Sequence, residues 1–160
     1  MRTCAVVDTG PLIILYQIGA LDLLRELYGE VLIPEAVRDE LLRGPSGQAI
    51  LSRTWVKVRG VMDRSVLEVL RAFLDDGEAE AIQLAREVGA TVIIIDERKG
   101  RRIARSLGLK VRGTLGILLE LKEKGLVEAV RPFISRMLGK GYYLDEKLIE
   151  EVLKAAGEGP

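Results

Sequence analysis

Four acidic residues, Asp8, Glu40, Glu78 and Asp96, are the candidates for chemistry in this chain. The chain contains no histidine, which excludes His-based acid–base catalysis and His-ligated zinc. Its one cysteine, Cys4, lies within an apolar strand, and we expect no role for it as a ligand. Carboxylates alone suit a hard divalent cation, Mg²⁺ or Mn²⁺. Such an ion is commonly used to hold phosphate and to activate water.

Residues 77–102 predict how two of these acids are brought together. Apolar residues recur at helical spacing after Glu78, and Gly89 is placed to end that helix in a left-handed conformation. Residues 91–95 are β-branched throughout, which indicates a strand buried on both faces. The helix and the strand each cover about 16 Å. The chain therefore runs away from one edge of the sheet along the helix and returns to it along the strand. Glu78 and Asp96 should then lie at the same sheet edge.

The other two acids have comparable positions. Asp8 ends an otherwise apolar strand over residues 3–7 and is followed by a turn. Glu40 belongs to a helix expected over residues 35–42, where it borders the buried apolar stripe. A carboxylate beside an apolar face is less stable than one in water, so Glu40 is the functional candidate of this helix.

Each acid also has a structural alternative. Asp8 and Asp96 could cap the helices that follow them, Glu78 could complement its helix dipole, and Glu40 could reach solvent. Glu80 lies on a different helix face from Glu78. We expect Glu80 to form a salt bridge, with a reserve metal ligand as the alternative.

A basic segment begins directly after Asp96, so part of it should flank the acidic site. Its members are Arg98, Lys99, Arg101, Arg102, Arg105, Lys110 and Arg112. An acidic pocket rimmed by cations suits the cleavage of a polyanion, and we expect nucleic-acid contacts from Arg98, Lys99, Arg101 and Arg102. The alternative is a solvated helix face. Aromatic residues are sparse, so base stacking would be limited to Tyr142 and Tyr143, because Trp55 is expected in the core.

Composition limits the protein class. The 160 residues fit one domain, and 48% hydrophobic with 30% charged residues indicates a globular chain. The formal net charge is zero, which argues against a whole-surface nucleic-acid binder but allows a local patch. We expect no signal peptide and no membrane span, and one cysteine suits the reducing cytoplasm. The absence of asparagine, with abundant Glu, Lys, Arg, Ile and Val, is typical of a thermophile.

Short apolar segments alternate with helical periodicity, which predicts an α/β fold with a parallel sheet covered on both faces. The expected strands are residues 3–7, 30–33, 55–58, 91–95 and 110–112. The expected helices are residues 12–18, 21–28, 35–42, 64–74, 78–88, 99–107, 114–124, 130–138 and 144–156. Neither a dinucleotide-binding fingerprint nor a P-loop motif is present, so a dinucleotide-binding protein and a P-loop NTPase both lose their main support.

Four segments together resemble the PIN-domain family, most closely its VapC-like branch of predicted nucleic-acid-binding proteins. They are VVDTGPLI, LIPEAVRDEL, DDGEAEAIQLAREVGATVIIIDERKGRRIA and VRGTLGILLELKEKG. The resemblance implies a three-layer α/β/α sandwich with a central, mainly parallel sheet. We expect residues 1–160 to form one such domain, with a helical C-terminal extension from about residue 126.

The same resemblance implies a Mg²⁺ or Mn²⁺ site and ribonuclease activity. In this sequence Asp8, Glu40, Glu78 and Asp96 match the family's four acids, and Thr9 stands where a small hydroxyl often lies near the metal. We therefore expect a metal-dependent endoribonuclease that acts as the toxin of a toxin–antitoxin pair. Its partners would be RNA, an antitoxin protein and a second copy of the chain.

Two alternatives belong to other classes. One is a nucleic-acid-binding or regulatory module of the same fold that keeps the acids but does not cut. The other is a receiver-like domain that handles phosphate, which the lack of an Asp pair next to the first strand opposes.

Overall fold

The computed structural model describes residues 3–159, and within this range five strands form one parallel sheet. The strands are β1 (Cys4–Val7), β2 (Glu30–Ile33), β3 (Val56–Val58), β4 (Val92–Ile94) and β5 (Val111–Arg112). Their order across the sheet is β3-β2-β1-β4-β5, and every neighbouring pair is parallel.

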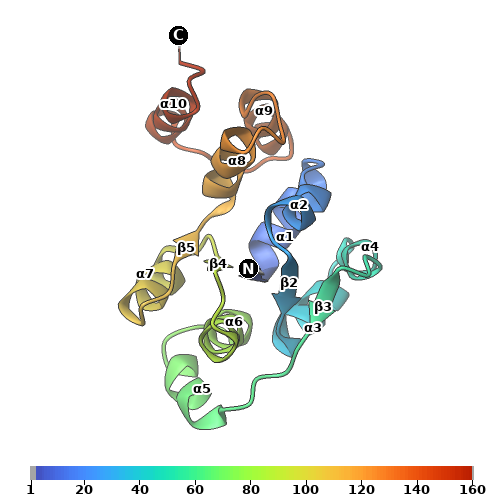
Figure 1. Cartoon of the computed structure of the whole chain (residues 1–160), viewed down its shortest axis with the longest axis vertical. Coiled ribbons are helices and arrows are strands. Elements are labelled where there is room, and N and C mark those ends of the chain that lie inside the picture. The colour runs from blue at the N-terminus through green and yellow to red at the C-terminus, as the bar shows by residue number, and fades with distance from the viewer. Residues whose placement is uncertain (1–2, 160) are drawn as a thin grey trace.

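Helices connect the strands and cover both faces of the sheet (Figure 1). Before the third strand they are α1 (Thr9–Gln17), the 3₁₀ turn η1 (Leu21–Leu23), α2 (Leu24–Leu27), α3 (Glu35–Arg43) and α4 (Gly47–Leu51). Between the third and fifth strands they are α5 (Arg64–Arg71), α6 (Asp76–Val88) and α7 (Arg98–Ser106). The last three are α8 (Thr114–Glu123), α9 (Arg131–Gly139) and α10 (Glu146–Ala155).

Alternate residues of each strand enter two different cores, as the two-residue period of a strand requires. Val6, Leu32 and Ile93 pack against α5, α6 and α7 on one face. Their neighbours Val7 and Ile94 pack on the other face, with α1 and the C-terminal helices α8, α9 and α10. The molecule is therefore a three-layer α/β/α sandwich, which confirms the predicted fold class.

The local predictions agree with the structure except at a few boundaries. Gly89 ends α6 with a φ of 61°, in the left-handed region where glycine carries no steric cost. Helix α1 begins at Thr9, three residues earlier than expected, because Pro11 is tolerated in a first turn. Helix α4 was not predicted. Its residue Ile50 is fully buried and holds this turn against the core.

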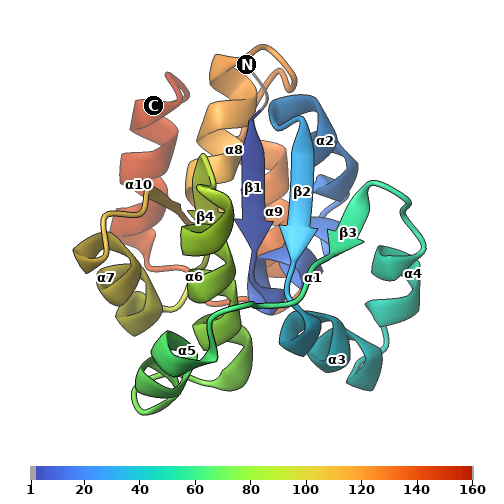
Figure 2. The ribbon, with the colours of Figure 1, turned by 60° about the horizontal axis from the view of Figure 1, so that its bottom comes forward.

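The direction in which successive strands are added to the sheet reverses between β1 and β4. From β1 the chain adds β2 and β3 on one side, and it then crosses to add β4 and β5 on the other. In open parallel sheets the crevice beyond the strand ends at such a point is where ligands bind. Figure 2 shows β1 and β2 side by side, with their arrowheads pointing the same way and α6 in front of β4.

The C-terminal helices share the main core. Ile117, Leu118 and Leu121 of α8 are fully buried, and Ile134 of α9 and Val152 of α10 are buried beside them. Leu115 and Leu119 of α8 remain partly exposed. No helix within residues 3–159 is long and apolar enough to cross a membrane.

Glu158 fastens the C-terminal segment to the start of α9. Its carboxylate accepts hydrogen bonds from the backbone N–H groups of Val130 at 2.7 Å and Arg131 at 3.1 Å, and it pairs with Lys122 Nζ at 2.9 Å. Glu158→Ala should therefore destabilise the fold by about 1–2 kcal/mol, the scale of a lost helix cap. Thermal melting would measure this against Glu150→Ala on the exposed face of α10. Equal melting temperatures for the two variants would contradict it.

Candidate active site

Asp8 and Asp96 come together because they follow adjacent parallel strands. Val7 pairs with Ile94 in the sheet, and the N–H of Asp8 donates to the carbonyl of Ile94 at 2.9 Å. Asp8 is 8% exposed, whereas Asp96 lies at the surface. Asp8 occupies the N-cap position of α1 but makes no side-chain capping bond. Capping therefore does not explain this buried carboxylate.

Glu78 lies in the first turn of α6, at the same edge of the sheet. This agrees with the prediction that the helix and the following strand run in opposite directions and bring Glu78 and Asp96 to one edge. It is buried and takes part in a capping box with Asp75. The Asp75 carboxylate accepts from the Glu78 N–H at 2.8 Å, and the Glu78 carboxylate accepts from the Asp75 N–H at 3.3 Å. Sequence reasoning missed Asp75, although Asp-x-x-Glu before an apolar run is a recognisable capping signal.

Glu40 approaches from α3, on the border of the stripe set by Val37 and Leu41. The hydroxyl of Thr9 donates to Glu40 Oε2 at 2.8 Å, which brings two of the predicted site residues together. Gly77 of α6 lies against this carboxylate, and a Cβ atom at that position would overlap Glu40 Oε1. A side chain at position 77 would therefore displace Glu40.

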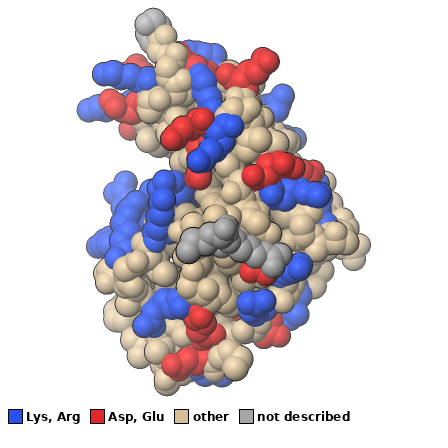
Figure 3. Space-filling view, in the orientation of Figure 1, with Lys and Arg blue, Asp and Glu red and all other residues tan. Residues whose placement is uncertain are grey.

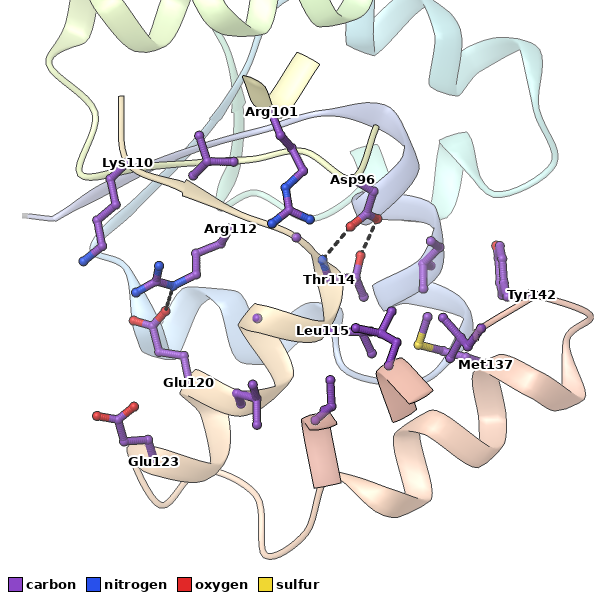
Figure 4. A pocket seen from close by; sticks show the side chains of 18 of the residues that line it. Asp96, Arg101, Lys110, Arg112, Thr114, Leu115, Glu120, Glu123, Met137 and Tyr142 are labelled. Atoms are coloured by element: carbon purple, nitrogen blue, oxygen red, sulfur yellow. Dashed lines mark hydrogen bonds and ion pairs between the residues drawn. The ribbon is translucent and has the colours of Figure 1, made fainter. Parts of the chain in front are cut away.

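Asp96 is bound to the start of α8. Its two oxygens accept from the N–H of Thr114 at 2.7 Å and from the hydroxyl of Thr114 at 2.6 Å (Figure 4). The structural alternative that Asp96 caps the next helix is wrong, because Glu97 caps α7 by accepting from the N–H of Gly100. Thr114, which is 2% exposed, was missed, and its place at a helix start was the only sequence signal.

Glu80 is buried and has partners of its own, although it lines the same pocket as Glu40 and Asp75. Its Oε1 accepts from the N–H of Ala36 at 3.0 Å, in the first turn of α3, and its Oε2 lies 3.7 Å from Arg71 Nη2. These contacts attach α3 to α6 and include the expected salt bridge.

Asp8, Glu40, Asp75, Glu78 and Asp96, hereafter the acidic cluster, act on one another electrostatically. Burial above all, together with the charges of Asp75, Glu40 and Asp96, raises the pKa of Asp8 from 3.8 to about 7, and the hydrogen bond from the N–H of Thr9 opposes this rise. Burial, then Asp75 and Asp8, raise the pKa of Glu78 from 4.5 to about 7. Burial raises the pKa of Glu40 as well, opposed by the Thr9 hydroxyl. A cation would relieve this repulsion.

The donor set fits a hard divalent cation, because it consists of carboxylate and hydroxyl oxygens. Within residues 3–159, however, no three Asp, Glu or Cys side chains are arranged so that they could hold one ion. Three of these carboxylates accept hydrogen bonds from other groups: Thr9 binds Glu40, Thr114 binds Asp96, and the Asp75 backbone binds Glu78. The chemistry of the cluster suits the ion, and the hydrogen bonds seen here compete with it.

The raised pKa values predict a pH-dependent stability. Asp8 and Glu78 bind protons more tightly in the folded protein, so their protonation stabilises the fold. This contribution to the free energy of unfolding is complete below their unfolded pKa values and is lost as pH rises through about 7. Between about pH 6 and pH 8, Asp8 alone should cost the metal-free protein roughly 1 kcal/mol, or about 2–4 °C in Tm. Melting in EDTA would measure the fall, and Asp8→Asn should reduce it. A Tm that rises over this range would contradict the account.

The basic residues divide between two environments. A groove of about 920 Å³ opens beside Asp96, and Arg101, Arg105, Lys110 and Arg112 line it (Figure 4). Of the four predicted nucleic-acid contacts only Arg101 lines this groove. Arg98, Lys99 and Arg102 are exposed elsewhere on α7, with Lys99 Nζ 6.0 Å from the centre of the Phe73 ring. Figure 3 shows cations gathered over α7 and β5, beside the hollow below the C-terminal helices.

A family model described as a PIN domain matches residues 4–158 of the chain. The matched region includes every residue of the acidic cluster and all five strands. Comparison with curated proteins gives no match.

Proposed function

Because the chain belongs to the PIN-domain family, which is a nuclease family, we propose that it is a metal-dependent endoribonuclease that hydrolyses RNA phosphodiester bonds. The observation that carries the proposal is the acidic cluster at the switch point between β1 and β4. Its members come from four separate stretches of chain, and their mutual repulsion is a cost that binding a cation would remove.

Each acid has a role that follows from its position. Asp8 and Asp96 stand at strand ends, so they are the most rigidly placed and would hold Mg²⁺ or Mn²⁺ directly. Glu40 and Glu78 reach in from helices and would bind through water or orient the attacking water. A bound ion would supply a water of lowered pKa and would neutralise charge on the phosphate.

We expect Arg101 to contact the phosphate beside the ion. An added Cβ at Gly113 would lie 2.9 Å from both Arg101 Nη1 and Asp96 Oδ1, so the guanidinium and the carboxylate both approach this bare backbone. A cation next to Asp96 can receive the non-bridging oxygens of a phosphate held at the cluster. We expect Arg98, Lys99 and Arg102 to add long-range attraction for RNA.

The test is cleavage of a labelled RNA with the full chain in Mn²⁺, in Mg²⁺ and in EDTA. Internal cuts are expected with either ion and none in EDTA, with activity restored by returning the metal. Ca²⁺ should not restore it, because its looser coordination holds the attack geometry poorly. Cleavage that continues undiminished in EDTA would refute a metal-dependent mechanism.

A second candidate is a nucleic-acid-binding or regulatory module that does not cut. The arrangement of the cluster favours it, since no three acids within residues 3–159 are set to hold an ion and Thr9 and Thr114 occupy two of them. RNA binding without cleavage in either metal would select this candidate.

We also propose that the protein acts in the cytoplasm as the toxin of a toxin–antitoxin pair and forms a homodimer. The resemblance to the VapC-like branch supports this proposal. Growth arrest on expression, relieved by a co-expressed product of an adjacent small reading frame, would test the antitoxin partner. Light scattering at tens of micromolar would test the dimer, and a monomeric mass there would refute it.

A further inference from the structure

Helix α3, which carries Glu40, begins without a cap from its own segment. Pro34 occupies the N-cap position and makes no side-chain hydrogen bond to the first turn. The N–H of Ala36 instead donates to Glu80 Oε1 at 3.0 Å, and Glu80 belongs to α6, 44 positions further along the chain. A carboxylate from a different helix therefore satisfies one of the free N–H groups at the start of α3.

A second contact joins the same two helices one turn away. Ala36 and Glu40 are four residues apart on α3, so they share one face of it. Gly77 and Glu80 are similarly close on α6. Ala36 meets Glu80, and Glu40 meets Gly77, where a Cβ atom would overlap the carboxylate. The helices are therefore antiparallel along this contact, and the Ala36–Glu80 hydrogen bond sets which turn of α3 faces Gly77.

Apolar packing does not fill this junction. A hollow of about 630 Å³ opens beside it, and Ala36, Glu40 and Glu80 are among its lining residues. Val37 and Leu41 bury the apolar stripe of α3 in the core, but apolar burial is non-directional and does not by itself fix a helix along its axis. The hydrogen bond between Ala36 and Glu80 supplies a directional contact.

Glu80 is itself held from the other side. It is 7% exposed, and its Oε2 lies 3.7 Å from Arg71 Nη2 on α5. Arg71 is fixed in turn by Glu68 and Asp76, each at 3.1 Å. A buried carboxylate is costly unless it is paired and hydrogen-bonded, and Glu80 has both kinds of partner. It is therefore rigidly placed between α3 and α5.

We propose that Glu80 is a positioning residue, which fixes α3 on α6 and thereby places the Glu40 carboxylate in the acidic cluster. The proposal rests on the proposed function, because it assigns Glu80 a part in cleavage that is exerted through Glu40. Glutamine at position 80 can still accept from the N–H of Ala36 through its amide oxygen, whereas alanine cannot. Glu80→Ala should therefore lose a role that Glu80→Gln keeps.

The first experiment measures cleavage of a labelled RNA by the full chain in Mn²⁺. Glu80→Ala should lower kcat about 10²-fold, the scale for a catalytic group displaced by roughly 1 Å, and should leave KM near the parental value. Glu80→Gln should keep the parental kcat. Adding Glu80→Ala to Glu40→Gln should cost little more than Glu40→Gln alone, because both changes act on the same group. Losses that multiply in the double variant would overturn the proposal.

A second variant separates positioning from simple capping. Pro34→Ser, added to Glu80→Ala, gives α3 a cap from its own segment, since serine is a favoured N-cap residue. Glu80→Ala should lower the melting temperature by about 2–4 °C, the scale of a lost cap in a chain of this size. Pro34→Ser should restore the melting temperature while kcat stays low. If it restored both, Glu80 would be only a cap and the proposal would be wrong.

A third measurement is independent of cleavage. The Thr9 hydroxyl donates to Glu40 Oε2 at 2.8 Å, so the effect of Thr9→Val reports whether Glu40 is in place. In EDTA, Thr9→Val should lower the melting temperature of the parent chain and of Glu158→Ala equally, and should have little effect in Glu80→Ala. Equal losses in all three backgrounds would refute the proposal. If the parent chain cuts no RNA in Mn²⁺ or Mg²⁺ and this melting pattern holds, the placement of Glu40 by Glu80 stands and the nuclease fails.

Discussion

Asp8→Asn should abolish RNA cleavage without weakening the fold. Asparagine has nearly the same shape, so the side chain should keep its place at the end of β1, but a neutral amide binds Mg²⁺ poorly. The substitution also removes a buried carboxyl group, whose pKa is raised to about 7 by burial and by its acidic neighbours. The metal-free variant should therefore melt at the same temperature as the parent chain or higher at neutral pH.

Two measurements are needed for this prediction, a cleavage rate in Mn²⁺ and a thermal melt. Loss of cleavage with an unchanged or higher Tm assigns the effect to the site, because an unfolded variant would fail both tests. A parental cleavage rate in a preparation free of contaminating nuclease would mean that the reaction takes place elsewhere.

Asp96→Asn tests the second strand-end ligand and adds a readout independent of activity. Its amide oxygen can still accept from the N–H of Thr114, so the start of α8 should remain capped. At a hundredfold excess over its dissociation constant, a metal that binds only the folded parent chain stabilises it by ~2.7 kcal/mol. Asp96→Asn should show a much smaller shift. Equal shifts would remove Asp96 from the metal site.

Glu40→Gln and Glu78→Gln should each slow cleavage by about 10²–10⁴-fold, the usual scale for a lost acid–base or water-orienting group. Both residues reach the cluster from helices, so we place them one step further from the ion than the two aspartates. Some activity should therefore remain. A loss as complete as that of Asp8→Asn would show instead that these glutamates hold the ion directly.

Glu80→Gln is the matched control for Glu78→Gln, because both residues lie on α6. Its amide oxygen can still accept from the N–H of Ala36, and the contact to Arg71 that it gives up is 3.7 Å long. Cleavage should therefore remain close to the parental rate. If Glu80→Gln were as damaging as Glu78→Gln, the two residues could not have the separate roles that their contacts indicate.

All five strands, most of the helices and the meeting of the acids at one sheet edge could be predicted from the sequence alone. Hydrophobic periodicity depends on neighbours a few residues apart, so it predicted all five strands and the outward and returning path from Glu78 to Asp96. The border position of Glu40 followed from the angle between residues on a helix. The resemblance to the PIN-domain family was carried by the order and spacing of these same acids, and the family match confirms it.

The tertiary structure decided which side chains the acids contact and which cations face them. Thr114 reaches Asp96 across 18 positions, and Thr9 reaches Glu40 across 31, so no local pattern could pair them. The groove needs α7, β5, α8 and the C-terminal segment to pack together before Arg105 and Tyr143 line one space. A helix pattern shows which residues share a face, and only the packing of distant elements determines what that face meets.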